Sequence, residues 1–294
     1  MRFKSHFRKD TLSIFLNVLS AMARFSKAGK PNSVRSFLKL SSEKIQLNVR
    51  NVDLVEAYAE FDTKDIFHED FLIESKRQNM IGLAIPMQNF HDALKSGLNC
   101  EKITVRLSKR QGQGVLSFEF NDPLMENLSV TQDCPVQPLM GDSFNDATLP
   151  EIPACEWNIE LPPAKHLLNV LLQMQKLGNE TIEFLLKRSN KIINLCELQI
   201  SSDSEIVSVK SRYTNCHLFA QESISEETQL IRSFKLKRVV NALKVGGETL
   251  LSRANDGFSL LGNVNIGGRR LRHSCKRRIT ALDLHNFYFK FVSF

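Results

Sequence analysis

The chain has 294 residues, of which 42% are hydrophobic and 24% charged, as in ordinary globular proteins. This length favours two domains, each large enough to bury its own core. No apolar run approaches the roughly 20 residues that a membrane-spanning helix needs, and the first residues lack the apolar block of a signal peptide, so we expect a soluble, intracellular protein without membrane contact. Six cysteines lie far apart with no C-x-x-C pair, which disfavours a zinc site or a disulfide framework.

The net charge of +7 is concentrated near the C-terminal end. Residues 269–294 contain seven Lys and Arg and one acid, which leaves residues 1–268 with 32 basic and 31 acidic side chains. A nearly neutral body is no argument for nucleic-acid binding by itself. Such an argument depends on where the basic residues lie.

Residues 1–135 alternate short predicted strands with two predicted helices. Apolar residues at helical spacing predict a helix over about Asp10–Lys27. A second helix is expected to begin at Pro86 and to end near Ser96, because Pro suits the first helical turn. The predicted strands are Ser36–Leu40, Ile45–Arg50, Val55–Phe61, Phe71–Ile73, Met80–Ile85, Lys102–Lys109 and Gly114–Asn121.

The stretch Val136–Cys155 contains three Pro, two Asp, one Gly and one Asn and has no sustained periodicity, so we interpret it as an exposed connector. After it come a predicted strand, Glu156–Leu161, a helix from Pro162 to about Leu177, and a helix over about Phe234–Val245. The other predicted strands of this half are Thr181–Lys187, Lys191–Leu198, Glu205–Tyr213, Glu248–Arg253 and Gly257–Ile266.

Each half therefore has the order strand, helix, strands, helix, strands. This repetition predicts an internal structural duplication and an α+β fold. We expect an N-terminal domain at 1–135, a connecting loop at 136–155 and a C-terminal domain at 156–294, whose residues 267–294 form an atypical basic tail.

Motifs for catalysis are absent. The sequence has no Walker motif, no G-x-G-x-x-G, no H-E-x-x-H and no G-x-S-x-G. His68 beside Glu69 and Asp70 is the only cluster of His with acids, and a surface turn explains it better than a catalytic pair. We predict that the protein is not an enzyme and holds no cofactor or metal, although distant residues can assemble a site that one sequence does not reveal.

The outward stripes of the predicted helices carry basic residues. On an exposed helix Lys is usually only solvated, and near the C-terminal end it also offsets the helix dipole. Two domains of equal build would place these stripes on one surface, where they would meet DNA phosphates without reading bases. Asp92, on the same face as Lys95, argues against this for the second helix. The predicted DNA-facing residues are Arg24, Lys27, Lys95, Lys165, Lys176, Lys237 and Lys244.

Several segments, in their order along the chain, resemble the Hus-one-type subunit of the heterotrimeric (nine-one-one) DNA-damage checkpoint clamp. The resemblance covers roughly residues 1–266, and its specificity lies in the ordered set because no single motif is diagnostic. The segments are Met1–Lys4, Leu12–Lys27, Phe37–Leu47, Gln132–Val136, Leu161–Pro163 and Lys235–Leu243.

The resemblance implies a PCNA-like sliding clamp, in which each domain places two helices inside a ring and antiparallel sheets outside. Two paralogous subunits would complete a heterotrimer around double-stranded DNA, independently of sequence, and an ATP-driven clamp loader would open it. It also implies checkpoint signalling through an ATR-type kinase, docking of repair enzymes, and a nuclear location with some protein in the cytoplasm.

By the same resemblance, two strands with alternating apolar residues are edges that pair with neighbouring subunits. Their residues are Val115, Ser117, Phe118, Phe120, Ile206, Val207, Val209 and Tyr213. The connector is expected to border a groove for client proteins, through Leu139, Met140 and Phe144; the simpler alternative is a tether.

The chain departs from the family in two places. Lys27–Val34 contains an insertion, and Gly267-Gly268 leads into a basic segment where the family ends in a short apolar strand. This segment is a nuclear-import signal, a second phosphate-binding patch, or sequence outside the folded domain. Alternating Phe residues predict a strand over Asn286–Val292, which would restore the missing edge. The basic residues are Arg269, Arg270, Arg272, Lys276, Arg277 and Arg278.

Three alternatives remain open. A homotrimeric replication clamp would carry more strongly basic inner helices. A two-domain nucleic-acid enzyme would need a catalytic constellation that the sequence lacks. A scaffold without DNA contact is consistent with the nearly neutral body.

Overall fold

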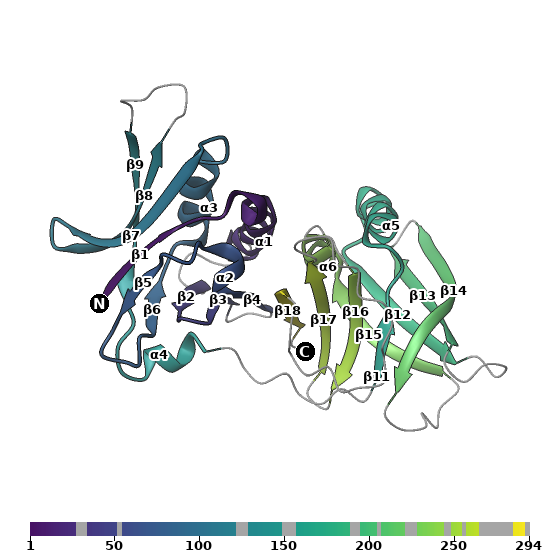
Figure 1. Cartoon of the computed structure of the whole chain (residues 1–294). Helices are drawn as coiled ribbons and strands as arrows, with labels where there is room; N and C mark the ends of the chain where they lie inside the picture. The colour runs from purple at the N-terminus through teal and green to yellow at the C-terminus, as the bar shows by residue number, and fades with distance from the viewer. Residues whose placement is uncertain are drawn as a thin grey trace. The chain divides into compact units, whose positions relative to one another are not determined.

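The chain forms two compact units, one of Met1–Pro150 with Val264–Phe287 and the other of Glu151–Asn263 with Tyr288–Phe294. Each unit combines helices with antiparallel sheets (Figure 1), so the predicted α+β class is confirmed. The computed structural model describes residues 1–27, 34–51, 55–121, 129–148, 157–188, 195–204, 207–220, 228–243, 248–254, 257–264 and 285–291.

The first unit contains two sheets, with strand orders β5-β1-β7-β8-β9 and β10-β6-β2-β3-β4. Its helix α1 packs against α3. The strands are β1 (Arg2–His6), β2 (Val34–Leu40), β3 (Lys44–Asn51), β4 (Val55–Asp62), β5 (Leu72–Glu74), β6 (Ile81–Ala84), β7 (Lys102–Arg110), β8 (Gln113–Asn121), β9 (Ser129–Pro135) and β10 (Gln137–Pro138). The helices are α1 (Lys9–Lys27), α2 (Thr63–Ile66), α3 (Met87–Ser96) and α4 (Ser143–Asp146).

A series of aromatic rings joins the helices of this unit to its sheets. Phe15 of α1 lies 5.0 Å from Phe61 of β4 and 6.2 Å from Phe90 of α3, measured between ring centroids. Phe90 in turn lies 5.8 Å from Phe118 of β8. All four side chains are buried. Such aromatic pairs each add about 0.5–1.5 kcal/mol beyond the burial of their area.

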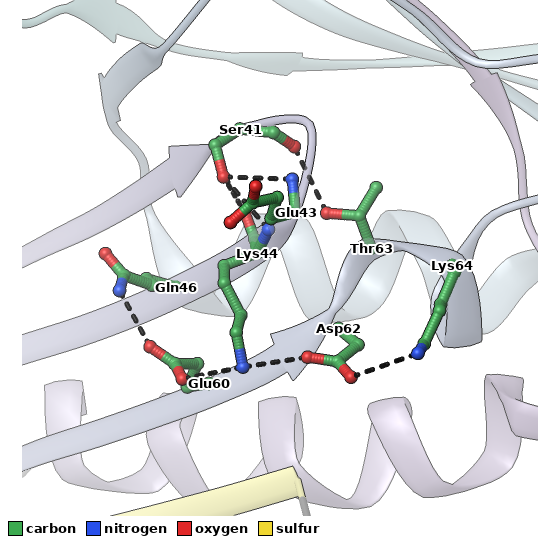
Figure 2. A network of polar contacts seen from close by, with 8 residues as sticks. All are labelled: Ser41, Glu43, Lys44, Gln46, Glu60, Asp62, Thr63 and Lys64. Atoms are coloured by element: carbon green, nitrogen blue, oxygen red, sulfur yellow. Dashed lines mark hydrogen bonds and ion pairs between the residues drawn. The ribbon is translucent and has the colours of Figure 1, made fainter. Parts of the chain in front are cut away.

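Polar contacts tie the turn between β2 and β3 to the end of β4 (Figure 2). The Ser41 hydroxyl accepts a hydrogen bond from the Lys44 N–H at 2.9 Å and donates one to the Lys44 carbonyl at 3.0 Å. The Lys44 ammonium lies 2.8 Å from Asp62 and 3.1 Å from Glu60. Burial lowers the pKa of Lys44, but the hydrogen bonds to Asp62 and Glu60 outweigh burial and raise this pKa above its ordinary value. The network holds the hairpin where β4 passes into α2.

The second unit contains one sheet, in the order β17-β16-β11-β14-β13-β12-β15. Its helices α5 (Ala164–Lys176) and α6 (Leu236–Leu243) pack together. Their buried side chains are Leu167, Leu171 and Met174 from α5 and Leu236, Val239, Val240 and Leu243 from α6. The strands are β11 (Trp157–Glu160), β12 (Thr181–Arg188), β13 (Leu195–Asp203), β14 (Ser208–Ala220), β15 (Thr228–Lys235), β16 (Glu248–Ala254) and β17 (Gly257–Val264).

The two units repeat the same plan. In the first, β1 precedes α1 and pairs with β5 and β7; in the second, β11 precedes α5 and pairs with β14 and β16. The predicted duplication and the four predicted helices are confirmed. The predicted strand near the C-terminal end is also present, as β18 (His285–Phe291).

The connector differs from the expectation. Within it β10 pairs with β6 and α4 forms a short helix, and Val136, Phe144 and Ala147 are buried. Most described residues of 136–148 are exposed, as expected of a connector, but these three side chains are buried, and the stretch adds a strand and a helix to the first unit.

Candidate nucleic-acid and subunit interfaces

In the first unit, α1 presents the exposed Lys9 at its first residue and mostly uncharged side chains further along. Its exposed side chains include the uncharged Ser13 and Asn17. Arg24 is half-buried, and burial lowers its pKa. Within the described part of the chain its Nε has no hydrogen-bond partner. The side chain of Lys27 lies outside the described part, so Arg24 is the only predicted DNA-facing side chain placed on this helix.

On α3 the predicted DNA-facing Lys95 is exposed, but an acid accompanies it. The Gln88 amide donates to the two Asp92 carboxylate oxygens at 2.7 and 2.8 Å. The Nδ1 of His91 lies 2.9 Å from the same carboxylate. Asp92 is thus held on the exposed side of the helix, and its charge offsets that of Lys95 one turn further on.

In the second unit, α5 carries bases and no acid. Lys165 and Lys176 are both exposed. A separation of eleven residues is about three helical turns, so the two side chains emerge on one side, about 16 Å apart along the axis. Helix α6 also contains no acid; the side chain of its Lys237 lies outside the described part, as does all of Lys244. The structure therefore brings Lys165 and Lys176 onto one face.

Strand β8 is not an edge. It pairs with β7 on one side and with β9 on the other. The prediction that Val115–Phe120 is an edge strand at a subunit interface is wrong, because these residues form an interior strand. The four residues assigned to that interface are buried: Val115, Ser117, Phe118 and Phe120. The edge is β9, which pairs only with β8 within the described residues.

Strand β14 keeps one unpaired side over most of its length. Ser208–His217 pairs with β13, whereas β11 pairs with Leu218–Ala220. The register shifts near Asn215, whose φ of 63° is left-handed, a conformation that Asn tolerates. No other described strand pairs with Ser208–His217. Of the residues predicted at this edge, Val207, Val209 and Tyr213 are half-buried and Ile206 lies outside the described residues.

The three residues predicted to dock client proteins differ in exposure. Met140 is 69% exposed, Leu139 is half-buried and Phe144 is 8% exposed. Phe144 packs against Gly82 of β6, where an added Cβ would lie 2.7 Å from its ring. The Phe144 side chain therefore packs against the first unit itself, whereas the Met140 side chain is exposed to solvent.

A cleft of about 820 Å³ lies at the end of β1. In it the His6 Nδ1 lies 3.0 Å from the Thr104 hydroxyl, and burial lowers the His6 pKa. The predicted surface turn at His68 is exposed and lines this cleft. Among the described residues, no group of His, Cys, Asp and Glu is arranged to hold a metal ion. No described helix is long and apolar enough to span a membrane.

The basic residues of the tail, Arg269, Arg270, Arg272, Lys276, Arg277 and Arg278, lie outside the described residues. Their roles stay predictions.

Comparison with known proteins identifies the family. The model of the family described as Hus1-like protein matches residues 1–239. The chain belongs to the Hus1-like family. This confirms the resemblance seen in the sequence. The family match ends within α6, so the basic tail lies beyond it.

One curated relative and one solved structure extend this result. The chain is 27% identical over 186 residues to checkpoint protein hus1 of Schizosaccharomyces pombe, an alignment that covers 62% of this chain and 61% of that protein. The match thus spans about three fifths of the relative. PCNA from Entamoeba histolytica has a TM-score of 0.63 at 14% identity, over 99% of this chain and 98% of that one. This Hus1-like chain therefore has a PCNA-like fold.

Proposed function

We propose that the chain is one subunit of a heterotrimeric ring that encircles double-stranded DNA at damage sites and supports checkpoint signalling. The family match carries this proposal, together with a sheet edge in each unit with which no further described strand pairs: β9 in the first and Ser208–His217 in the second. A subunit with two different open edges can pair head to tail with two neighbours, which is the geometry of a closed ring. Pairing also removes the hazard of exposed edges.

Contact with DNA is sequence-independent in this proposal. Lys165 and Lys176 on α5 supply phosphate contacts, together with Lys237 of α6, which packs against α5, and Lys244, which follows α6 in the sequence. Lys95 contributes less because Asp92 offsets it. A protein that slides along DNA needs such contacts to phosphates and none to base edges.

The proposed partners are two paralogous clamp subunits, an ATP-driven loader and repair enzymes. The fission-yeast relative is named a checkpoint protein, and this name supports a role in damage signalling in the nucleus. A homotrimeric replication clamp is the second candidate, favoured by the likeness to a PCNA over almost the whole chain. The Hus1-like match favours the heterotrimer over this candidate.

Topological retention tests encirclement. The assembled ring would be loaded onto nicked circular DNA with the loader and ATP of the same organism, washed at high salt, and then treated with an enzyme that cuts the circle once. The proposal predicts that the ring stays on circular DNA and slides off after the cut. Loss from circles at high salt, or retention after the cut, would contradict it.

A further inference from the structure

Two buried cysteines lie opposite one another on neighbouring strands of the second unit. Cys196 of β13 is the register partner of Cys216 of β14 in an antiparallel pair. Their residues are 1% and 8% exposed, so both side chains lie on the buried face of the sheet. They are 20 residues apart in the sequence, and the pairing of the two strands brings them together.

The spacing of this pair suits a disulfide. Residues directly opposite one another in an antiparallel pair have Cα atoms about 4.5–5.5 Å apart, and disulfides join Cα atoms that are about 4.4–6.8 Å apart. Cys134 is buried as well, but it lies opposite Leu116. Within the described part of the chain, no other two cysteines share a register position.

Both cysteines are free thiols that donate weak hydrogen bonds to the backbone. The Cys196 Sγ donates to the Cys216 carbonyl at 3.5 Å, and the Cys216 Sγ donates to the Tyr213 carbonyl at 3.6 Å. Because a thiol is a weak donor, giving up these two contacts costs little. Rotation of the two side chains toward each other is therefore inexpensive.

The pair lies beside an irregular part of β14. The register shifts between Cys196 and Leu198, and Asn215 has a left-handed φ of 63°. Such a bulge interrupts the ladder of backbone hydrogen bonds. Strand segments with fewer backbone contacts open locally at lower cost, which gives a small oxidant access to Cys216.

We propose that Cys196 and Cys216 form a reversible oxidation site, at which hydrogen peroxide closes a disulfide that fixes the bulge of β14. In the first step the Cys216 sulfur attacks a peroxide oxygen, the O–O bond breaks, and a sulfenic acid and one water form. In the second step the Cys196 sulfur attacks the sulfenic sulfur, the S–S bond forms, the S–O bond breaks, and a second water leaves. The two thiols together lose two electrons and two protons, which convert one peroxide into two waters. A thiol reductant reverses the link.

Burial makes this oxidation slow. It raises the pKa of the Cys216 thiol, and it raises the pKa of the Cys196 thiol to about 12. The thiolate is the reactive form, so little of either sulfur is reactive at neutral pH, and the rate should increase with pH. Cys216 reacts first because it is the more exposed of the two. The link therefore forms under sustained exposure to peroxide.

The test treats the intact, reduced chain with hydrogen peroxide at about pH 8, alkylates the remaining thiols and maps the unreduced peptides by mass spectrometry. The map should contain Cys196 and Cys216 as one linked pair, which dithiothreitol separates. The melting temperature of the oxidised chain should rise by at least about 4 °C, because the link restricts the unfolded chain. Cys134 is the internal control and should remain a thiol in the folded chain.

Cys196→Ser is the matched variant. Its Cys216 should stop at the sulfenic acid, which dimedone traps, and peroxide should not raise its melting temperature. Absence of the linked pair from the oxidised intact chain, or a link that lowers the melting temperature, would overturn the proposal. The map of the intact chain gives this answer even if the serine variant does not fold. The assay needs no other subunit and no DNA, so its result is independent of ring formation.

Discussion

Phe90 of α3 and Phe118 of β8 lie with their ring centroids 5.8 Å apart, at the junction of helix and sheet in the first unit. Phe118 is fully buried, and its strand is paired on both sides. A residue in this position stabilises the subunit itself and is not available to a neighbouring subunit.

Phe118→Ala should lower the free energy of unfolding by about 3–5 kcal/mol, because it leaves a cavity where the ring meets Phe90. Urea denaturation of the isolated chain measures this. Val130→Ala on the edge strand β9, where the side chain is 44% exposed, is the matched control and should change stability by less than about 0.5 kcal/mol. If the Phe118→Ala chain unfolds like the intact chain but fails to assemble, Phe118 belongs to the subunit interface and this account is wrong.

Proline at the two open edges should prevent assembly without unfolding the subunit. Hydrogen-bonding groups of neighbouring residues in a strand point to opposite sides, so one of Val130→Pro and Thr131→Pro spares the pairing with β8. The same holds for Val209→Pro and Lys210→Pro on β14. In each pair, the variant that keeps the melting temperature should lose one neighbour in a pull-down. Normal assembly of every stable variant would place the interface elsewhere.

Reversing the charges on α5 should weaken the retention of the ring on DNA. Lys165→Glu with Lys176→Glu should reduce the slope of log affinity against log salt by roughly 2, since each lost phosphate contact removes about 0.9. The control is Lys109→Glu with Lys187→Glu, which makes the same charge change at exposed positions on strands. Equal losses for the two double variants would show a general charge effect and no specific role for α5.

The Lys44 network predicts a pH dependence of stability. Because its pKa is raised in the folded state, the ion pairs stabilise fully below the ordinary value of 10.5, and this contribution is lost as pH rises through the folded pKa. Lys44→Met should therefore be less stable than the intact chain at about pH 8, with a smaller difference at about pH 11. Lys64→Met, whose 75% exposed side chain lies 3.8 Å from Asp62, should matter little. A Lys44→Met difference that is the same at both pH values would contradict this account.

The helices were predictable because their burial follows the helical period. On α1, Leu12, Phe15 and Leu19 are all buried, as the spacing of apolar residues indicates. The edge strand β9 gave no such signal. In β9, Ser129, Val130 and Thr131 are all exposed, so the strand has no apolar alternation to detect.

Two predictions failed for the same physical reason: the assignment of Val115–Phe120 to an edge strand and the placement of Phe144 in an exposed connector. In both cases tertiary contacts decide which side chains are buried. Val115, Leu116, Ser117 and Phe118 are buried in succession, since β8 is covered on both faces, and local alternation does not distinguish such a strand from an edge. Phe144 is a single aromatic residue in a largely polar segment that contains Gly141, Asp142 and Asp146. Its contacts with Gly82, Lys39 and Arg77, all far away in the sequence, bury it.

The most direct test of the proposed function is the mass of the complex that the chain forms. The chain would be co-expressed with the two paralogous clamp subunits of its organism, and the purified product examined by native mass spectrometry. The account predicts one complex containing one copy of each subunit. A chain that remains alone, or that assembles only with further copies of itself, would contradict it.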